Sequence, residues 1–341
     1  MDLKDRVDAL VALGQRMEDL STDFWKEKIE QAGYHNGWFT ATSVESALTG
    51  IRDKMLDRAK LEQWLSAYPQ LSQKTEAKKV GLILAGNIPL VGFHDIISVF
   101  IAGHLAMIKM SDKDTILPEA LIAVLAEIEP KTSNFLLRSE KMVGIDAVIA
   151  TGSNNSARYF ESYFGKIPHI IRKNRNSIGL IFSNTNLDTI KLMGQDIFTY
   201  FGLGCRNVSK LLVPRGYDLT LIMEALHEYN EVNLHHKYKN NFDFNIAVNM
   251  LNKQHYLNNG SVMLCEDSSL ASRIATLHFE YYENEDDLIS KVKQHDGELQ
   301  VVVSEKPLDF VKTVLPGCAQ QPELWDYADE VDTMEFLINL G

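Results

Sequence analysis

The chain has 341 residues, a formal net charge of −12 at pH 7 and a pI near 5.3. That length accommodates two domains with a core each, and the acidic balance argues against a nucleic-acid partner, which needs a basic face. No apolar run is long enough to span a bilayer, and the three widely spaced cysteines form neither a disulfide framework nor a metal-binding pattern, so we expect a cytoplasmic protein with no transmembrane segment and no metal site.

The first 75 residues or so have the patterning of helices. Apolar side chains recur at helical spacing in three segments, and Thr42 and Glu45 have the spacing of a capping box at the start of the third. The charged residues are most simply a solvated face, and a cover for an apolar ligand is the alternative. The apolar positions are Val7, Leu10, Val11, Met17, Leu20, Phe24, Trp25, Ile29, Ala47, Leu48, Ile51, Met55, Leu61 and Trp64.

From residue 80 short buried strands alternate with helices. This alternation, with short turns between the elements, predicts a parallel sheet flanked by helices. Such sheets bind ligands at the carboxyl ends of their strands, where the polar turns of this chain fall. A G-x-G-x-x-G motif is absent, so the usual dinucleotide fingerprint is missing. The predicted strands are 80–85, 105–110 and 146–150, and the predicted helices are 92–102, 115–128 and 154–164.

A second α/β unit is predicted after the strand at 178–182. It begins with a helix capped by Asn186 or Asp188, and the stretch Lys237–Asn245, rich in Asn and Lys, is predicted to be a surface loop. The segment Met334–Ile338 is predicted to be an edge strand or a docking helix. The other predicted strands are 211–213, 261–264, 274–279 and 299–303, and the other helices are 219–229 and 286–295.

The fold class is therefore α/β, with two domains. We expect residues 1–182 to form a helical N-terminal region and a dinucleotide-binding domain. Residues 183–312 are expected to form a catalytic domain, and residues 313–341 a C-terminal docking segment.

The stretch 201–214 places a single thiol at a junction between a helix and a buried strand. Gly202 and Gly204 bring the backbone close to Cys205, which leaves room for a substrate. Arg206 beside it favours the thiolate, whose pKa in the free residue is about 8.5. For a cysteine taken alone, a small buried hydrophobe is the more common role. The other motifs of the chain favour a nucleophile.

Four motifs stand in a fixed order along the chain, and they carry a family resemblance. They are Gly86-Asn87-Ile88-Pro89, Ala102-Gly103-His104 with Ile108-Lys109-Met110-Ser111, Thr151-Gly152-Ser153, and Gly202-x-x-Cys205. Together they resemble the aldehyde dehydrogenase superfamily, and within it the acyl-CoA reductases that supply aldehyde to bacterial luciferase. The tail segment Trp325–Asp329 is also similar. The resemblance implies a cofactor domain and a second α/β domain with a catalytic cysteine.

The resemblance implies that Asn87 donates a hydrogen bond to the oxyanion that forms when Cys205 attacks a carbonyl carbon. The physical chemistry agrees, because thiolate attack on a thioester builds negative charge on oxygen. A side-chain amide and the backbone N–H of Cys205 are donors that suit this charge. On local grounds alone, Asn87 is equally well a turn former before proline.

The cofactor residues are also implied by the resemblance. Lys109 and Ser111 match an element that contacts the adenosine ribose or its phosphate, although Met110 replaces the proline of that element. Thr151, Gly152 and Ser153 open a helix, where N–H groups and the helix dipole favour phosphate. The alternatives are a surface charge at Lys109 and ordinary N-capping by Ser153 or the next residue, Asn154. We expect NADP(H) to be favoured over NAD(H), because Lys109 suits a 2′-phosphate.

The sequence departs from the family at the residue that activates water. The aldehyde dehydrogenases that release acids carry a glutamate that activates water, and the matching stretch here, Arg172–Asn176, has no carboxylate. Without that base, exchange with a thiol is favoured over hydrolysis. The basic run is either a solvated face or a contact for phosphates, and His169 just before it is either structural or a proton shuttle. The glutamate that would hold the nicotinamide ribose is Glu266 or Glu280.

These observations predict an enzyme, an NAD(P)H-dependent reductase of fatty acyl-CoA that forms the aldehyde through an acyl-enzyme on Cys205. The expected partner is the acyl-CoA substrate, and the resemblance allows a homo-oligomer or an acyl-transfer enzyme as a protein partner. Two alternatives stay open. One is a reductase of another activated acid, an acyl phosphate or a carrier-bound thioester, and the other is a non-catalytic acyl-binding homologue.

Overall fold

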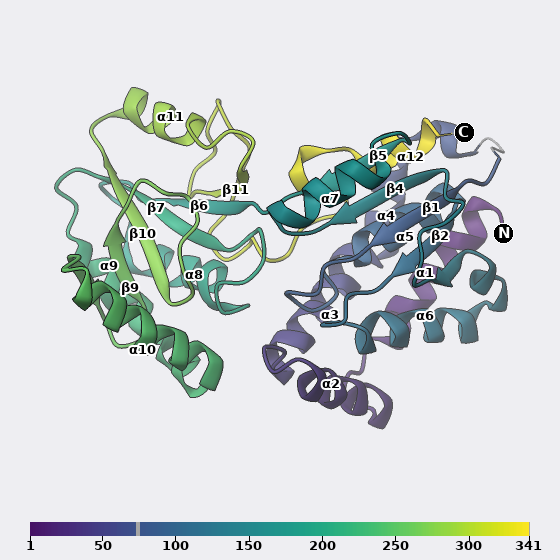
Figure 1. Cartoon of the computed structure of the whole chain (residues 1–341), viewed down its shortest axis with the longest axis horizontal. Coiled ribbons are helices and arrows are strands. Elements are labelled where there is room, and N and C mark those ends of the chain that lie inside the picture. Colours follow the sequence, from purple (N-terminus) through teal and green to yellow (C-terminus); the bar gives the residue numbers. More distant parts are fainter. Residues whose placement is uncertain (73–75, 341) are drawn as a thin grey trace. The chain divides into compact units, whose positions relative to one another are not determined.

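The computed structural model of the protein describes residues 1–72 and 76–340, and it divides into two compact units (Figure 1). Unit 1 contains Met1–Asn174 together with the chain from Pro322 on, and unit 2 contains Arg175–Gln321. Residues 73–75 and 341, which fall inside the predicted helical region and the predicted docking segment, lie outside the described residues. No described helix combines the length and the apolar character that crossing a membrane requires.

Unit 1 contains the predicted parallel sheet, with five strands in the order β3-β2-β1-β4-β5. The chain runs outward from β1 to β2 and β3, and then returns to the other side of β1 with β4 and β5. Ile83 at the end of β1 is in register with Lys109 of β2 and with Ala150 of β4. The carboxyl ends of these three strands are therefore neighbours at the point where the strand order reverses. The strands are β1 (Lys79–Ile83), β2 (Leu105–Lys109), β3 (Leu136–Arg138), β4 (Ala147–Thr151) and β5 (His169–Arg172).

Among the described residues of unit 1, four α-helices precede this sheet, three more follow its strands, and one comes from the tail. They are α1 (Leu3–Arg16), α2 (Asp23–His35), α3 (Ala41–Met55), α4 (Arg58–Ser66), α5 (Phe93–Ala102), α6 (Ile116–Ile128), α7 (Asn154–Phe164) and α12 (Thr333–Ile338). The predicted capping box at Thr42 is wrong, because α3 begins earlier and its N-cap is Thr40, whose side chain accepts the Ser43 N–H at 3.2 Å. Helix α5 contacts β1 and β2, whereas α7 contacts β4 and β5.

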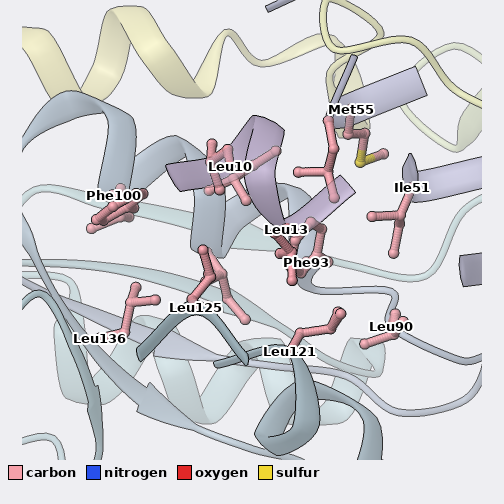
Figure 2. Packing of buried hydrophobic residues seen from close by; sticks show 14 of the residues in the cluster. Leu10, Leu13, Ile51, Met55, Leu90, Phe93, Phe100, Leu121, Leu125 and Leu136 are labelled. Carbon is pink, nitrogen blue, oxygen red and sulfur yellow. The ribbon is translucent and has the colours of Figure 1, made fainter. Parts of the chain in front are cut away.

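The core of unit 1 joins the N-terminal helices to the helices of the sheet. Leu10 and Leu13 of α1 are fully buried among side chains of α5 and α6, including Phe93, Phe100 and Leu125 (Figure 2). Each buried side chain of this size contributes about 1.5–3 kcal/mol to folding. The first 72 residues are therefore an integral part of unit 1.

The tail completes unit 1. Of the two predicted alternatives for residues 334–338, the structure shows the helix, α12, which packs against α5. Glu323 accepts from Lys54 Nζ at 2.7 Å, and the Tyr327 hydroxyl accepts from Trp64 Nε1 at 2.6 Å. The tail is thus attached to α3 and α4 as well as to α5.

Unit 2 contains a seven-stranded sheet in the order β12-β11-β6-β7-β10-β9-β8. Its strands pair in parallel except β8, which is antiparallel to β9. The strands are β6 (Asn176–Leu180), β7 (Val208–Pro214), β8 (Tyr256–Asn258), β9 (Met263–Glu266), β10 (Thr276–Tyr282), β11 (Leu299–Val303) and β12 (Thr313–Val314). The α-helices are α8 (Leu187–Phe198), α9 (Leu219–Leu226), α10 (His236–Leu251) and α11 (Glu285–Lys293).

The predicted loop at Lys237–Asn245 is wrong, because this stretch lies in helix α10. The buried positions of α10 are Tyr238, Phe242, Asn245 and Asn249, which recur at helical spacing. Two of these four positions are polar, so an apolar stripe is absent from the sequence. Asn245 is accommodated in the interior because its Nδ2 donates to the carbonyl oxygen of Ile274 at 2.9 Å.

The boundaries between the two units differ from the predicted domain boundaries. Strand β6 falls inside the first predicted domain, which extends to residue 182, but it pairs with β7 and β11 of the second sheet. Unit 1 accordingly ends at Asn174. The predicted docking segment also divides, since residues up to Gln321 belong to unit 2 and the chain from Pro322 on belongs to unit 1.

Candidate active site

Cys205 lies on the loop between α8 and β7 of unit 2, at the helix-to-strand junction that the sequence predicts. Phe201, Gly202 and Gly204 have positive φ values of 58°, 83° and 92°. Glycine adopts this left-handed backbone without strain, so the two glycines permit the tight turn. The Cys205 carbonyl oxygen accepts a hydrogen bond from Ser177 Oγ at 3.0 Å, which fastens the loop to β6. The half-buried thiol therefore sits on an anchored loop.

A small pocket adjoins this loop within unit 2. Its lining includes Gly202 and Asn207, which stand on either side of Cys205 in the sequence, but not Cys205 itself. Tyr238 contributes an apolar wall, and the Thr276 hydroxyl in the lining is buried with no hydrogen-bond partner among the described residues. The pocket thus brings a buried hydroxyl into the same lining as Gly202 and Asn207 of the loop that carries the thiol.

The other two cysteines have different environments. Cys265 is buried on β9, and this burial raises the pKa of its thiol to about 11. Because the thiolate is the nucleophilic form, Cys265 is inert at neutral pH. Cys318 is exposed and provides an accessible thiol for comparison with Cys205.

The predicted cofactor residues and Asn87 lie at or just after the carboxyl ends of neighbouring strands in the sheet of unit 1. Asn87 follows β1, Lys109 ends β2, and Thr151 ends β4, and these strands are neighbours. The side chains of Asn87, Lys109 and Ser153 are exposed. The structure therefore brings together the residues that the sequence places in unit 1, whereas Cys205 belongs to unit 2.

The turn that carries Asn87 is packed directly against the loop after β2. A Cβ atom at Gly86 would lie 2.6 Å from Ser111 Oγ, so only glycine fits there. Leu90, in the same turn, has a φ of 56°, and its N–H donates to Asp114 Oδ2 at 2.7 Å. Asp114 is not among the residues that the sequence singles out, because its burial and its contact with the 86–90 turn arise only in the folded structure.

The Thr151–Ser153 turn leads into α7 as predicted. Ser153 is the N-cap, and its side chain accepts the Ser156 N–H at 3.2 Å. The Gly152 N–H donates to the carbonyl oxygen of Arg172 at 3.2 Å, and a Cβ atom on Gly152 would come within 2.8 Å of Ser156 Cβ. Capping is thus what the structure shows here, and phosphate binding stays a prediction.

The basic run that begins at Arg172, the last residue of β5, is bound to other parts of the protein. Arg172 forms a buried ion pair with Asp95 of α5 and donates to Thr333 Oγ1 of α12 at 2.9 Å. Lys173 pairs with Glu161 at 2.9 Å. Of the two interpretations of this run, neither fits Arg172, whose side chain is 7% exposed.

Solved structures with this architecture decide the fold. An aldehyde dehydrogenase from Mycobacterium tuberculosis complexed with NAD⁺ has a TM-score of 0.62 and 15% identity, over 89% of this chain and 73% of that one. Aldehyde dehydrogenase 21 from Physcomitrella patens, in complex with its reaction product succinate, has a TM-score of 0.65 and 12% identity, over 90% and 74%. The chain has the aldehyde dehydrogenase fold.

A third structure agrees. It is an NADP-dependent glyceraldehyde-3-phosphate dehydrogenase from Bacillus halodurans C-125 complexed with NADP, which has a TM-score of 0.60 and 13% identity over 89% of this chain and 74% of that one. No protein-family model and no curated protein matches the sequence. The predicted fold class is therefore confirmed, while the predicted acyl-CoA reductase subtype stays a prediction.

Within this aldehyde dehydrogenase fold, the two candidate ribose-binding glutamates differ. Glu280 on β10 is bound internally, since its carboxylate accepts from Lys210 Nζ at 2.7 Å and from Lys291, and these contacts lower its pKa against the opposing effect of burial. Glu266 at the end of β9 is exposed. Of the two, Glu266 is the one whose side chain is available for a ligand. Among the described residues, no three His, Cys, Asp or Glu side chains group to hold a metal ion.

Asp196 of α8 attaches a distant segment to the helix that leads into the Cys205 loop. It is fully buried, and its two carboxylate oxygens accept the N–H groups of Gly317 at 2.7 Å and Ala319 at 2.8 Å. Burial raises the pKa of Asp196 from 3.8 to about 6, although the two N–H donors act in the opposite direction. A carboxylate that is protonated so readily makes the stability of unit 2 depend on pH.

We predict that Asp196→Asn changes this pH dependence in a defined direction. The folded protein binds the Asp196 proton more tightly than the unfolded chain does, so stability from this group is present below pH 4 and is lost as the pH rises through about 6. The free energy of unfolding of the wild type, minus that of Asp196→Asn, should fall by about 2 kcal/mol between pH 4 and 7. Denaturant titrations at four pH values measure it, and a difference that rises with pH would contradict the assignment.

Proposed function

We propose that the protein is an NAD(P)H-dependent acyl-CoA reductase that converts a fatty acyl-CoA thioester into the aldehyde through an acyl-enzyme on Cys205. The observation that carries this proposal is the position of Cys205, a half-buried thiol on a glycine-containing loop between α8 and β7 in an aldehyde dehydrogenase fold. The neighbours of known structure complexed with NAD⁺ and with NADP support a nicotinamide cofactor.

The proposed reaction starts with the Cys205 thiolate. It attacks the thioester carbonyl carbon, a new carbon–sulfur bond forms, and the displaced electron pair moves to the carbonyl oxygen. The Asn87 amide and the Cys205 N–H are the donors proposed for this oxyanion. When the carbonyl re-forms, the coenzyme A thiolate leaves and the acyl group remains on Cys205. Lys109, Ser111 and the Thr151–Ser153 turn would hold a reduced nicotinamide cofactor, which would supply a hydride to the acyl carbon. The aldehyde would then leave as the carbon–sulfur bond breaks and Cys205 returns to the thiolate.

The donors at the edge of unit 1 fit a phosphorylated dinucleotide. Lys109 offers an exposed cation at the end of β2, and the neighbouring end of β4 leads into the N-terminus of α7, with the exposed Ser153 as its cap. Free N–H groups and the helix dipole favour phosphate at such a terminus. Lys109 and Ser111 are proposed for the adenosine ribose or its phosphate, which favours NADPH over NADH.

The choice of acyl-CoA over acid formation is supported by the stretch 172–176. It contains no carboxylate, and the side chains of Arg172 and Lys173 are held in ion pairs with Asp95 and Glu161. A general base that activates water is therefore not supplied by this segment. An acyl-enzyme without such a base persists long enough to exchange with a thiol or to accept a hydride.

The experiment compares three acyl donors with the purified protein and NADPH. A long-chain acyl-CoA, the matching acyl phosphate and the matching carrier-bound thioester are supplied separately, and absorbance at the nicotinamide band is followed together with aldehyde formation. We expect acyl-CoA to be reduced fastest. Preference for either of the other donors would replace the proposed substrate, and no reduction with any donor would favour a non-catalytic acyl-binding protein.

A further inference from the structure

A buried carboxylate lies behind the turn that carries Asn87. Asp114 is 4% exposed, and its Oδ2 accepts the N–H of Leu90 at 2.7 Å. Its other oxygen, Oδ1, is buried and has no hydrogen-bond partner among the described residues. A carboxylate that is buried with one oxygen unsatisfied carries a substantial desolvation penalty. Hydrophobic packing alone does not account for an aspartate here.

The bond from Asp114 fixes an unusual backbone. Leu90 has a φ of 56°, in the left-handed region that leucine seldom adopts. The Leu90 N–H faces the carboxylate in this conformation, so the hydrogen bond offsets the backbone strain. Because Leu90 is three residues after Asn87, the direction of the whole 86–90 turn depends on this contact.

Asp114 also joins the turn to the loop after β2. Asp114 forms an isolated β-bridge with Ser111, and its N–H donates to the Ser111 carbonyl oxygen at 3.0 Å. Ser111 and Asp114 both pack against Gly86, where an added Cβ atom would lie 3.1 Å from Asp114 Cβ. The Asn87 turn and the loop that begins at Lys109 are therefore one packed piece.

Helix α2 holds this piece from the other side. His35 Nε2 is 2.6 Å from the Asp112 carbonyl oxygen, and Asn36 Nδ2 donates to the Lys113 carbonyl oxygen at 3.2 Å. The backbone on the N-terminal side of Asp114 is thus fixed at two successive residues. A carboxylate held in this way can in turn fix the position of Leu90.

We propose that Asp114 is the positioning residue of the proposed active site, whose carboxylate holds the turn of Asn87 in place against the loop of Lys109 and Ser111. This inference rests on the proposed function, because it concerns the oxyanion donor and the cofactor loop of that reaction. Asp114 acts through Leu90 and Ser111, and it does not contact the substrate.

The position of Asp114 makes this contact sensitive to pH near neutrality. Burial raises the pKa of Asp114 to about 7, and His35 of α2 opposes this effect. Asp112 and Lys113 on its own loop have exposed side chains, and the 86–90 turn contains no titratable side chain. Ionisation strengthens the hydrogen bond to Leu90, but the larger cost of burying the charge outweighs this gain. The closed turn therefore favours the protonated Asp114 and is held most firmly below pH 7.

The kinetic test measures the rate of acyl-adduct formation on Cys205 between pH 6 and 8.5. Asp114→Asn keeps an acceptor for Leu90 but cannot ionise, and Asp23→Asn on α2 makes the same change at an exposed carboxylate in the same unit. We expect the wild type to match Asp114→Asn at pH 6, where Asp114 is protonated, and to react about fivefold more slowly than Asp114→Asn at pH 8.5, because ionised Asp114 favours opening of the turn. The rate of adduct formation in Asp23→Asn should equal the wild-type rate at every pH. If the ratio of the wild-type rate to the Asp114→Asn rate does not change with pH, the proposal is overturned.

A second measurement needs no substrate. Amide hydrogen exchange of the peptide around Leu90, compared between proteins at the same pH, should be faster in the wild type than in Asp114→Asn at pH 8 and equal at pH 6. If no acyl donor modifies the wild type, the proposed function fails, whereas the exchange result still shows whether Asp114 holds the turn. Equal exchange at pH 8 would overturn the positioning role even in an active enzyme.

Discussion

Replacement of Cys205 by alanine is expected to abolish acyl-CoA reduction, with a loss of about a thousandfold or more in kcat/KM. The reason is that Cys205 is the proposed nucleophile and the other two thiols lie in different environments. Burial raises the pKa of Cys265 to about 11, and Cys318 lies in the segment whose backbone is held by Asp196. The variant should also form no covalent adduct with acyl-CoA in the absence of reductant.

The matched control for this variant is Cys318→Ala, which removes the exposed thiol. Its turnover and its acyl adduct should equal those of the wild type. Both variants should unfold at the wild-type temperature, because neither side chain belongs to the buried core. Unchanged turnover of Cys205→Ala would refute the assignment of the nucleophile, and loss of turnover in Cys318→Ala alone would move it to that residue.

Arg172→Ala is expected to have the largest effect on stability, a loss of about 3–5 kcal/mol in the free energy of unfolding. Arg172 and Asp95 are each 7% exposed, and the second oxygen of Asp95 already has no partner among the described residues. Removing the guanidinium leaves a buried, uncompensated carboxylate between β5 and α5. It also removes the hydrogen bond to Thr333 that attaches α12. Denaturant-induced unfolding measures the loss.

Lys173→Ala is the matched control, because the neighbouring pair of Lys173 and Glu161 is about half exposed on both sides. That variant should lose no more than about 1 kcal/mol. The double variant Asp95→Leu with Arg172→Met should recover most of the stability, since no charge is then buried alone. Equal losses in Arg172→Ala and Lys173→Ala would show that the buried pair has no special role.

The central strands of both sheets could be predicted from the sequence, whereas the edge strands could not. Strands β1, β2, β4, β6, β7 and β11 are runs of apolar residues between turn signals, and each was expected within a few residues of its observed position. The four strands that were not predicted are β3, β5, β8 and β12, each two to four residues long. All four lie at the edges of their sheets. Such strands are defined by pairing with a neighbour and carry little apolar pattern of their own.

Helix α10 was missed for a different reason. Its buried face includes Asn245 and Asn249, whose side-chain N–H groups donate to the Ile274 carbonyl oxygen and to Cys265 Sγ elsewhere in unit 2. Sequence periodicity detects apolar faces, and it cannot recognise polar residues that become buried through tertiary hydrogen bonds.

The places of the candidate site residues in the secondary structure could be predicted, whereas their roles stay predictions. The Cys205 loop, the turn of Asn87, and the ends of β2 and β4 lie where the motifs place them along the chain and in the sheets. Asp114 was not predicted, because its role depends on the packing of Gly86 against Ser111 and on burial by neighbouring elements. Arg172 likewise has the sequence context of a surface cation, because its pairing with Asp95, 77 residues earlier, depends on the fold.

The most direct test of the account is the intact mass of the protein after incubation with a long-chain acyl-CoA and without NADPH. We predict one added acyl group, located on Cys205 by peptide mapping, and its disappearance with release of aldehyde when NADPH is added. A protein whose mass is unchanged by acyl-CoA, or whose acyl group maps to Cys318, would contradict the account.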